Sequence, residues 1–171
     1  MTNVKLLLMP VILFLLLTLP SCTTSTANTE GERFGEFLDA FDDAIQLFVN
    51  GEPEPFMALW AQQDRTTLAG GLGGEIEAGW EAIGERLIRV SGMYGQFDQA
   101  RYSAHRVAYG FGERFGYLVQ QEEIEIDDAE TGTTATRFYR ASMTFERILG
   151  RWRIVHRQAD LHVVEDGGLR D

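Results

Sequence analysis

The feature that most restricts the fold of this chain is a run of four β-type segments in its second half. These segments cover residues 101–111, 115–127, 133–149 and 151–164, and they are rich in β-branched and aromatic residues. Short stretches with glycine at 110 and 112, at 132 and at 150 separate them. Connections this short join antiparallel neighbours, so the pattern predicts a meander of long antiparallel strands.

Three helical patterns precede the strands. They are predicted over about residues 34–48, 55–61 and 79–94, with a short strand at residues 66–69. The apolar positions at helical spacing are Phe34, Phe37, Leu38, Phe41, Ile45, Phe48, Phe56, Leu59, Trp60, Trp80, Ile83, Leu87, Val90 and Tyr94. Helices followed by a run of strands predict an α+β fold, in which a curved, cone-shaped antiparallel sheet packs against three N-terminal helices.

The first 21 residues have the pattern of an export signal. Lys5 supplies a positive charge, residues 6–19 are almost wholly apolar, and small residues lead to Cys22. The apolar run is shorter than the roughly 20 residues that cross a membrane, and Pro10 interrupts it. We therefore expect a cleaved signal peptide over residues 1–21 rather than a permanent transmembrane helix.

The segment Leu19-Pro20-Ser21-Cys22 resembles the bacterial lipobox, whose cysteine receives a lipid, although Pro20 is unusual in its position. The alternative, a disulfide-bonded or buried Cys22, is disfavoured because the chain has one cysteine and this one lies between an apolar run and a polar tract. The sequence thus predicts an exported, membrane-anchored lipoprotein of the cell envelope. In a Gram-negative cell we expect the periplasmic side of the outer membrane.

Composition sets the remaining domain boundaries and excludes one class of partner. After the signal we expect a flexible tether at 22–32, one folded domain at 33–165 and a tail at 166–171. Lys5 is the single lysine, so signal removal changes the formal net charge from −11 to −12. Such an excess of acidic residues disfavours nucleic acid as a partner and leaves membrane attachment to the lipid.

Three stretches resemble the SnoaL-like branch of the nuclear-transport-factor-2-like superfamily, which has a cystatin-like fold. They are Phe56-Met57-Ala58-Leu59-Trp60, Gly79-Trp80-Glu81-Ala82-Ile83 and Gly150-Arg151-Trp152-Arg153-Ile154-Val155-His156-Arg157. The resemblance spans about residues 34–164 and implies a conical pocket. Relatives often carry a second histidine and then Ser or Thr where this chain has Gln158 and Asp160. The fold hosts isomerases, cyclases, dehydratases, hydrolases and binders, so the resemblance does not transfer a reaction.

The concave face of the sheet is the predicted ligand site. We assume a three-residue bulged loop at Gly150 and a symmetric hairpin over residues 128–132, which place even-numbered residues of the last three strands together. That face would hold Leu118, Gln120, Glu122, Ile124, Phe138, Arg140, Ser142, Thr144, Trp152, Ile154, His156, Gln158 and Asp160. The expected pocket residues are Trp60, Trp80, Tyr109, Glu122, Phe138, Ser142, Trp152, Ile154 and Gln158.

The polar members of this face suggest two roles. In a catalytic interpretation, His156 or Asp160 is a general base, and Arg140, Tyr102 or Tyr109 stabilises an oxyanion. In the alternative, the charged groups only satisfy one another. The opposite face, expected to include Tyr139, Met143 and Phe145, is a candidate homodimer contact.

Nucleotide, cofactor and metal sites are not expected. The glycine-rich run Gly70-Gly71-Leu72-Gly73-Gly74 lacks the Lys-Ser/Thr of a P-loop, and His105, His156 and His162 form no ligand cluster with cysteine. The leading functional prediction is binding of a small, largely apolar molecule in a conical pocket. The alternatives are a cofactor-free acid–base enzyme of isomerase, cyclase or hydrolase type, and an accessory protein whose sheet face engages a partner.

Overall fold

A computed structural model describes residues 24–162, with side chains from residue 33 onward. The elements in chain order are α1 (Thr24–Phe48), α2 (Glu54–Met57), β1 (Thr67–Ala69), β2 (Glu77–Ala78), α3 (Trp80–Tyr94), β3 (Gln99–Phe111), β4 (Phe115–Asp128), β5 (Thr133–Ile148) and β6 (Arg151–Leu161). Cys22, the signal segment and the predicted tail lie outside the described residues.

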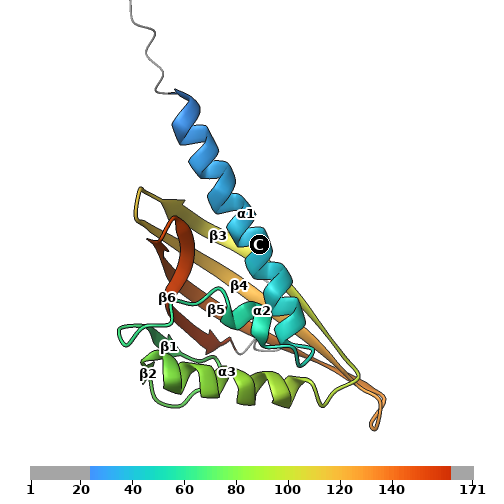
Figure 1. The fold of residues 1–171 in the computed structure, drawn as a ribbon. Coiled ribbons are helices and arrows are strands. Elements are labelled where there is room, and N and C mark those ends of the chain that lie inside the picture. Colours follow the sequence, from blue (N-terminus) through green and yellow to red (C-terminus); the bar gives the residue numbers. More distant parts are fainter. Residues whose placement is uncertain (1–23, 163–171) are drawn as a thin grey trace, which may run out of the picture.

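The strands form one curved six-stranded sheet in the order β2-β1-β6-β5-β4-β3 (Figure 1). Strands β3 to β6 are the predicted antiparallel meander. The short strand β1 pairs in parallel with β6, and β2 pairs with β1 at the edge, so the sheet is mixed rather than purely antiparallel. The α+β architecture with a curved sheet and N-terminal helices is confirmed.

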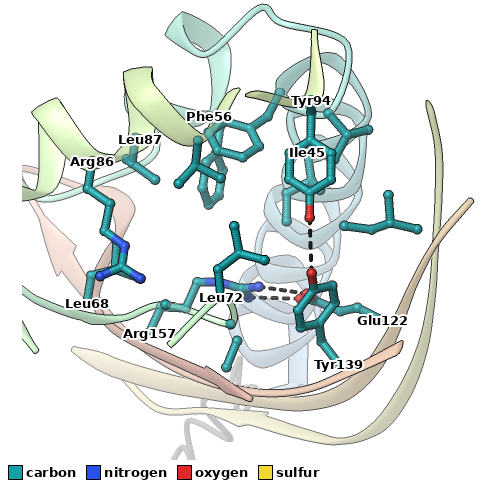
Figure 2. A pocket seen from close by; sticks show the side chains of 17 residues that line it. Ile45, Phe56, Leu68, Leu72, Arg86, Leu87, Tyr94, Glu122, Tyr139 and Arg157 are labelled. Carbon is teal, nitrogen blue, oxygen red and sulfur yellow. Dashed lines mark hydrogen bonds and ion pairs between the residues drawn. The ribbon is translucent and has the colours of Figure 1, made fainter. Parts of the chain in front are cut away.

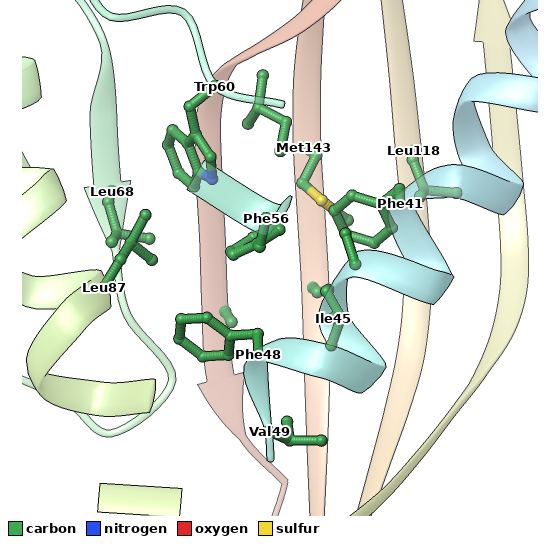
Figure 3. Packing of buried hydrophobic residues seen from close by; sticks show 14 of the residues in the cluster. Phe41, Ile45, Phe48, Val49, Phe56, Trp60, Leu68, Leu87, Leu118 and Met143 are labelled. Carbon is green, nitrogen blue, oxygen red and sulfur yellow. The ribbon is translucent and has the colours of Figure 1, made fainter. Parts of the chain in front are cut away.

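Helices α1 and α3 and the short α2 pack their apolar faces against one face of the sheet, which we call the covered face (Figure 3). The periodic positions Phe34, Leu38, Phe41, Ile45 and Phe48 are all buried there, as their spacing predicts. We call the other side of the sheet the open face.

The predicted start of the first helix and the predicted end of the second were wrong. Helix α1 begins at Thr24, so residues 24–32, predicted as a flexible tether, are its first turns. Helix α2 ends at Met57 rather than near residue 61. The reason is that the backbone after α2 turns to β6: Ile154 N–H donates to Leu59 O at 2.9 Å, and Ala61 N–H donates to Ile154 O at 2.8 Å.

Side-chain amides of α1 and of the turn that follows it protect the start of the edge strand β3. Gln46 donates to Ala100 O and accepts from Tyr102 N–H, both at 2.8 Å. Asn50 donates to Ala100 O at 2.9 Å and accepts from its N–H at 3.1 Å. These bonds satisfy backbone groups that an uncovered edge would leave open for another strand. They also fix α1 across the sheet.

Two hairpins and one bulge set the register of β4, β5 and β6, and they differ from the assumed geometry. The β4–β5 loop has four residues between the paired Asp128 and Thr133, so even residues of β4 face odd residues of β5. The β5–β6 loop is the two-residue turn Leu149-Gly150, whose φ angles of 49° and 78° are typical of a type I′ turn. The extra residue in β6 is Val155, because Thr144 pairs with His156 and Phe145 with Ile154.

The predicted face was therefore right in part. Leu118, Gln120, Glu122 and Ile124 of β4 and Trp152 and Ile154 of β6 do lie on the covered face. In β5 the covered residues are Tyr139, Ala141, Met143 and Phe145, so the assignment of Tyr139, Met143 and Phe145 to a dimer surface was wrong. After the Val155 bulge the covered residues of β6 are Arg157 and Ala159 instead of their even-numbered neighbours.

Candidate functional site

Side chains do not fill the covered face completely, and a cavity of about 90 Å³ remains between the sheet, α1 and α3 (Figure 2). Its apolar wall is formed mainly by Ile45, Phe48, Val49, Phe56, Leu68, Leu87, Val90 and Ile124. Its polar lining groups are Arg86, Tyr94, Glu122, Tyr139 and Arg157. Since one water needs about 10–15 Å³ of such space, the cavity accommodates a small molecule of several non-hydrogen atoms.

A buried ion pair forms the floor of the cavity. Arg157 Nη1 and Nη2 donate to Glu122 Oε1 and Oε2 at 2.8 and 2.6 Å, in a two-point contact. The Glu122 side chain is 2% exposed and that of Arg157 is 12% exposed, so each needs the other. Burial alone lowers the pKa of Arg157, but the Glu122 carboxylate outweighs it and raises that pKa above its ordinary value.

The pair continues into a polar network under α1. Gln120 Nε2 donates to Glu122 Oε1 at 2.8 Å and to the Tyr102 hydroxyl at 2.9 Å. Burial, followed by the charges of Glu122 and Asp42, raises the pKa of Tyr102, which keeps this phenol neutral. Asp42 also has a raised pKa, chiefly through burial, although Arg106 Nη2 donates to it at 2.5 Å. The network thus carries paired charges and neutral donors.

Two phenols form a second polar group at the cavity wall. The hydroxyls of Tyr94 and Tyr139 lie 3.1 Å apart, and both side chains are buried (Figure 2). Burial and then the bond to Tyr94 raise the pKa of Tyr139, so the Tyr139 hydroxyl stays protonated at neutral pH. One hydroxyl hydrogen is used between the two oxygens, which leaves the second for another acceptor.

The glycine-rich run closes one side of the cavity as a loop between β1 and β2. Arg86 of α3 donates to Gly73 O at 2.6 Å and forms an ion pair with Glu77. A β-carbon at Gly70 would lie 2.3 Å from Arg86 Nη2, so a side chain there would displace the guanidinium from its position. The run predicted as a flexible turn at the cavity mouth does line the cavity, through Gly70, Gly71 and Leu72.

The residues predicted for catalysis lie on the open face. Arg140 pairs with Asp160 across β5 and β6, and their side chains are 62% and 47% exposed. His156 Nδ1 lies 2.7 Å from the Thr67 hydroxyl of β1. The physical reason is the register described above, which turns these three residues away from the cavity. Tyr102 lies on the covered face within the polar network, but it does not line the cavity.

Of the predicted pocket residues, Glu122 lines the cavity. Trp60, Trp152 and Ile154 are buried in the core, and Trp80 packs against it from the first turn of α3. Tyr109 is 55% exposed beside Phe34, with ring centroids 6.5 Å apart. The register places Phe138, Ser142 and Gln158 on the open face.

Sequence reasoning missed Arg86, Tyr94, Tyr139 and Arg157 as cavity residues. Tyr94 carried a signal, since it ends the apolar stripe of the third helix, where an aromatic hydroxyl is a polar group in an apolar setting. Arg86 occupies a buried position of α3 next to Leu87. Tyr139 and Arg157 gave no such signal, because only the register and the bulge place them on the covered face.

Within residues 24–162, no group of three or more His, Cys, Asp or Glu side chains has a geometry suited to a metal ion. None of the helices described is long and apolar enough to span a membrane.

Comparisons with known proteins show similarity in structure but not in sequence. No family model matches the chain, and no curated protein matches it either. A nuclear transport factor 2-like superfamily protein from Salmonella enterica superposes with a TM-score of 0.64 at 18% identity, covering 82% of this chain and 96% of that one.

Two further solved structures show the same likeness. A nuclear transport factor 2-like protein of unknown function from Pseudomonas putida has a TM-score of 0.65 at 13% identity, over 82% of this chain and 92% of that one. A ketosteroid isomerase-like protein from Erwinia carotovora has a TM-score of 0.61 at 13% identity, over 80% and 99%. Together with the curved sheet and its covering helices, these likenesses show that the chain has the nuclear-transport-factor-2-like fold expected from its sequence.

Proposed function

We propose that the protein binds a small, uncharged and largely apolar molecule in the cavity between the sheet, α1 and α3. The observation that carries this proposal is an apolar cavity whose charged lining groups are already paired. Glu122 is held by Arg157, and Arg86 by Glu77. A ligand with its own charge would have to break one of these pairs or remain uncompensated, and either costs several kcal/mol, roughly 3–5 for a broken buried pair.

The polar groups that remain suit a neutral oxygen. The spare hydroxyl hydrogen of the Tyr94–Tyr139 pair is a donor with a raised pKa on the Tyr139 side. It favours a ligand that carries a carbonyl, ether or hydroxyl oxygen. The resemblance to a superfamily that includes small-molecule binders supports the same conclusion.

Acid–base catalysis is the second candidate, and one observation bears on it. Both carboxylate oxygens of Glu122, the one acidic side chain lining the cavity in the described part of the chain, accept hydrogen bonds from Arg157, so proton uptake by Glu122 would disturb a buried ion pair. The geometry therefore favours binding. An enzyme would be indicated by turnover of a bound molecule that is lost in Glu122→Gln and retained in His156→Asn.

The test of binding is native mass spectrometry of the purified full chain, with two variants of α3. Val90→Phe fills the cavity that Val90 lines, whereas Ile88→Phe introduces the same aromatic side chain at a position 55% exposed. We expect a co-purified small molecule in the wild type and in Ile88→Phe, and its loss in Val90→Phe. If neither native spectra nor a panel of uncharged probes shows binding, the proposal is wrong.

We also propose that the chain is exported and anchored through a lipid on Cys22. The lipobox-like segment and the acidic net charge support this, since an acidic domain gains nothing from anionic headgroups. Changing Cys22→Ser should move the protein from the membrane fraction to the soluble fraction. Retention of the variant in the membrane fraction would contradict the anchor.

A homodimer through the open face is the proposed assembly. Phe115, Tyr117 and Val119 are 54%, 49% and 40% exposed at one end of β4, where they form an apolar strip. In a two-fold symmetric dimer, the strip of one copy would pack against the same strip of the second copy. Light scattering after size-exclusion chromatography should report a dimer for the Cys22→Ser protein and a monomer when Tyr117→Arg is added.

A further inference from the structure

A second pocket lies on the other side of the glycine-rich loop from the cavity. This open hollow is lined by Gly70, Gly71, Leu72, Gly73, Ala159, Asp160 and Leu161. Four of these, Gly70, Gly71, Leu72 and Ala159, also line the inner cavity. The two spaces are therefore separated by a wall that is one loop thick.

The wall is thin because its residues have almost no side chains. A β-carbon at Gly71 would lie 2.6 Å from Tyr139 Cδ1, so the backbone lies directly against the phenol ring. Leu72 is the large side chain of the wall, and it is 44% exposed although it reaches the cavity (Figure 2). It is therefore the one large side chain among the residues that line both spaces.

The loop is held on both sides of Leu72. Gly73 N–H donates to Gly70 O at 3.0 Å, and Arg86 donates to Gly73 O at 2.6 Å. Gly73 and Gly74 have φ angles of 78° and 99°, a region that glycine enters without strain. These contacts hold the ends of the turn, so the Leu72 side chain, rather than the loop backbone, is the part of the wall that is free to move.

We infer that the outer hollow is a second subsite of the same binding site and that the ligand is an extended, uncharged molecule with a hydrocarbon chain. One end occupies the inner cavity, and the chain passes Leu72 to lie against Leu161, which is 49% exposed at the end of β6. The hollow suits hydrocarbon, because its one charged lining residue, Asp160, is paired with Arg140. This inference rests on the proposed binding function and adds the length of the ligand.

The test is a chain-length series of neutral probes: n-butanol, n-hexanol, n-octanol and n-decanol. Binding to the full-length Cys22→Ser protein is measured by titration with two-dimensional NMR. Each added methylene that leaves water strengthens binding roughly fourfold. We expect this gain to continue through n-decanol, because the longer chains would extend past Leu72 into the outer hollow.

A matched pair of variants tests where the hydrocarbon chain of the probe lies. Leu161→Ser should weaken n-decanol binding roughly tenfold, as expected for the loss of an apolar wall, and leave n-butanol binding unchanged. Leu149→Ser, at a hairpin residue 98% exposed, is the control and should change neither.

The possible outcomes separate the two proposals. Affinity that stops rising after n-hexanol, or an equal effect of Leu161→Ser on n-butanol and n-decanol, would overturn the second subsite while leaving cavity binding in place. Absence of binding by every alcohol would overturn both.

Discussion

The two faces of the sheet each hold an arginine–carboxylate pair, and the pairs differ in almost every property except chemistry. Arg157 and Glu122 lie on the covered face with side chains 12% and 2% exposed. Arg140 and Asp160 lie on the open face with side chains 62% and 47% exposed. The first pair spans from β6 to β4 over the intervening strand, whereas the second joins directly opposite residues of β5 and β6.

The difference shows how burial decides what a charge pair does. On the open face, water solvates each partner and screens the attraction, so the pair adds little stability. On the covered face, neither charge is tolerated alone, so the pair fixes two long side chains and neutralises the cavity floor. We therefore propose that the ligand binds on the covered face, where the arginine–carboxylate pair is buried.

The largest expected effect tests which face is covered. Phe145 is fully buried against Phe34 and Phe37, while Phe138 is half-buried on the open face. We expect Phe145→Ala to lower the free energy of unfolding by about 3–5 kcal/mol, and Phe138→Ala by about 1 kcal/mol, because only the first leaves a core cavity. Urea unfolding measures both, and equal losses would contradict the register of β5.

Removing one arginine from each face tests the pairs themselves. Arg157→Ala leaves Glu122 buried without a partner and should cost about 3 kcal/mol, the lower end of the range, because the site is slightly exposed to water. Arg140→Ala should cost less than about 0.5 kcal/mol, because its pair is solvated. The double change Arg157→Met with Glu122→Leu should regain most of the loss. A double variant no more stable than Arg157→Ala would mean that packing, not charge, is responsible.

The acids of the two faces should show opposite dependence on pH. On the covered side, burial raises the pKa of Asp42 above 3.8, so its contribution to stability is present below that pH and is lost as pH rises through the folded-state value. On the open face, bonds from Arg101 and Thr134 lower the pKa of Asp127 below 3.8, so its contribution is present above that pH and is lost as pH falls.

Two amide variants turn these signs into a measurement. The stability of the Asp42→Asn variant relative to wild type should rise as pH increases from 4 upward. That of Asp127→Asn should rise as pH falls below 4. The reason is that the ordinary pKa of an aspartic acid is about 4, whereas an amide does not titrate. Thermal unfolding across this range reads out both slopes. Parallel slopes would show that the two faces do not differ in this way.

The smallest effect concerns the turn that aligns β5 with β6. Leu149 has a φ of 49°, a left-handed conformation that costs a leucine more than an asparagine. Leu149→Asn should stabilise the protein by about 0.5 kcal/mol, and Leu149→Val should destabilise it by a similar amount, because β-branched side chains tolerate this region poorly. Differential scanning calorimetry resolves the change. An unchanged melting temperature in both variants would indicate a different turn.

Much of the architecture could be predicted because its signals are local. Apolar side chains every three or four residues define α1 and α3, and glycines at 132 and 150 divide the strands. The candidate site could be predicted only in part: Glu122 was placed correctly, because β4 has one uninterrupted alternation and one buried face. His156, Asp160 and Arg140 were placed on the wrong face, because each depends on counting residues across a turn or bulge.

The sequence by itself determined the order of helices and strands, the α+β class, the apolar stripe of α1 and the expectation of a cavity under a curved sheet. Periodicity and turn residues act over a few positions, so they can be read without knowing what packs against them. Only the tertiary structure decided that Arg157, rather than His156, lies at the cavity floor. A four-residue loop, a two-residue turn and one extra residue at Val155 set that choice, and each moves every later side chain to the opposite face of its strand.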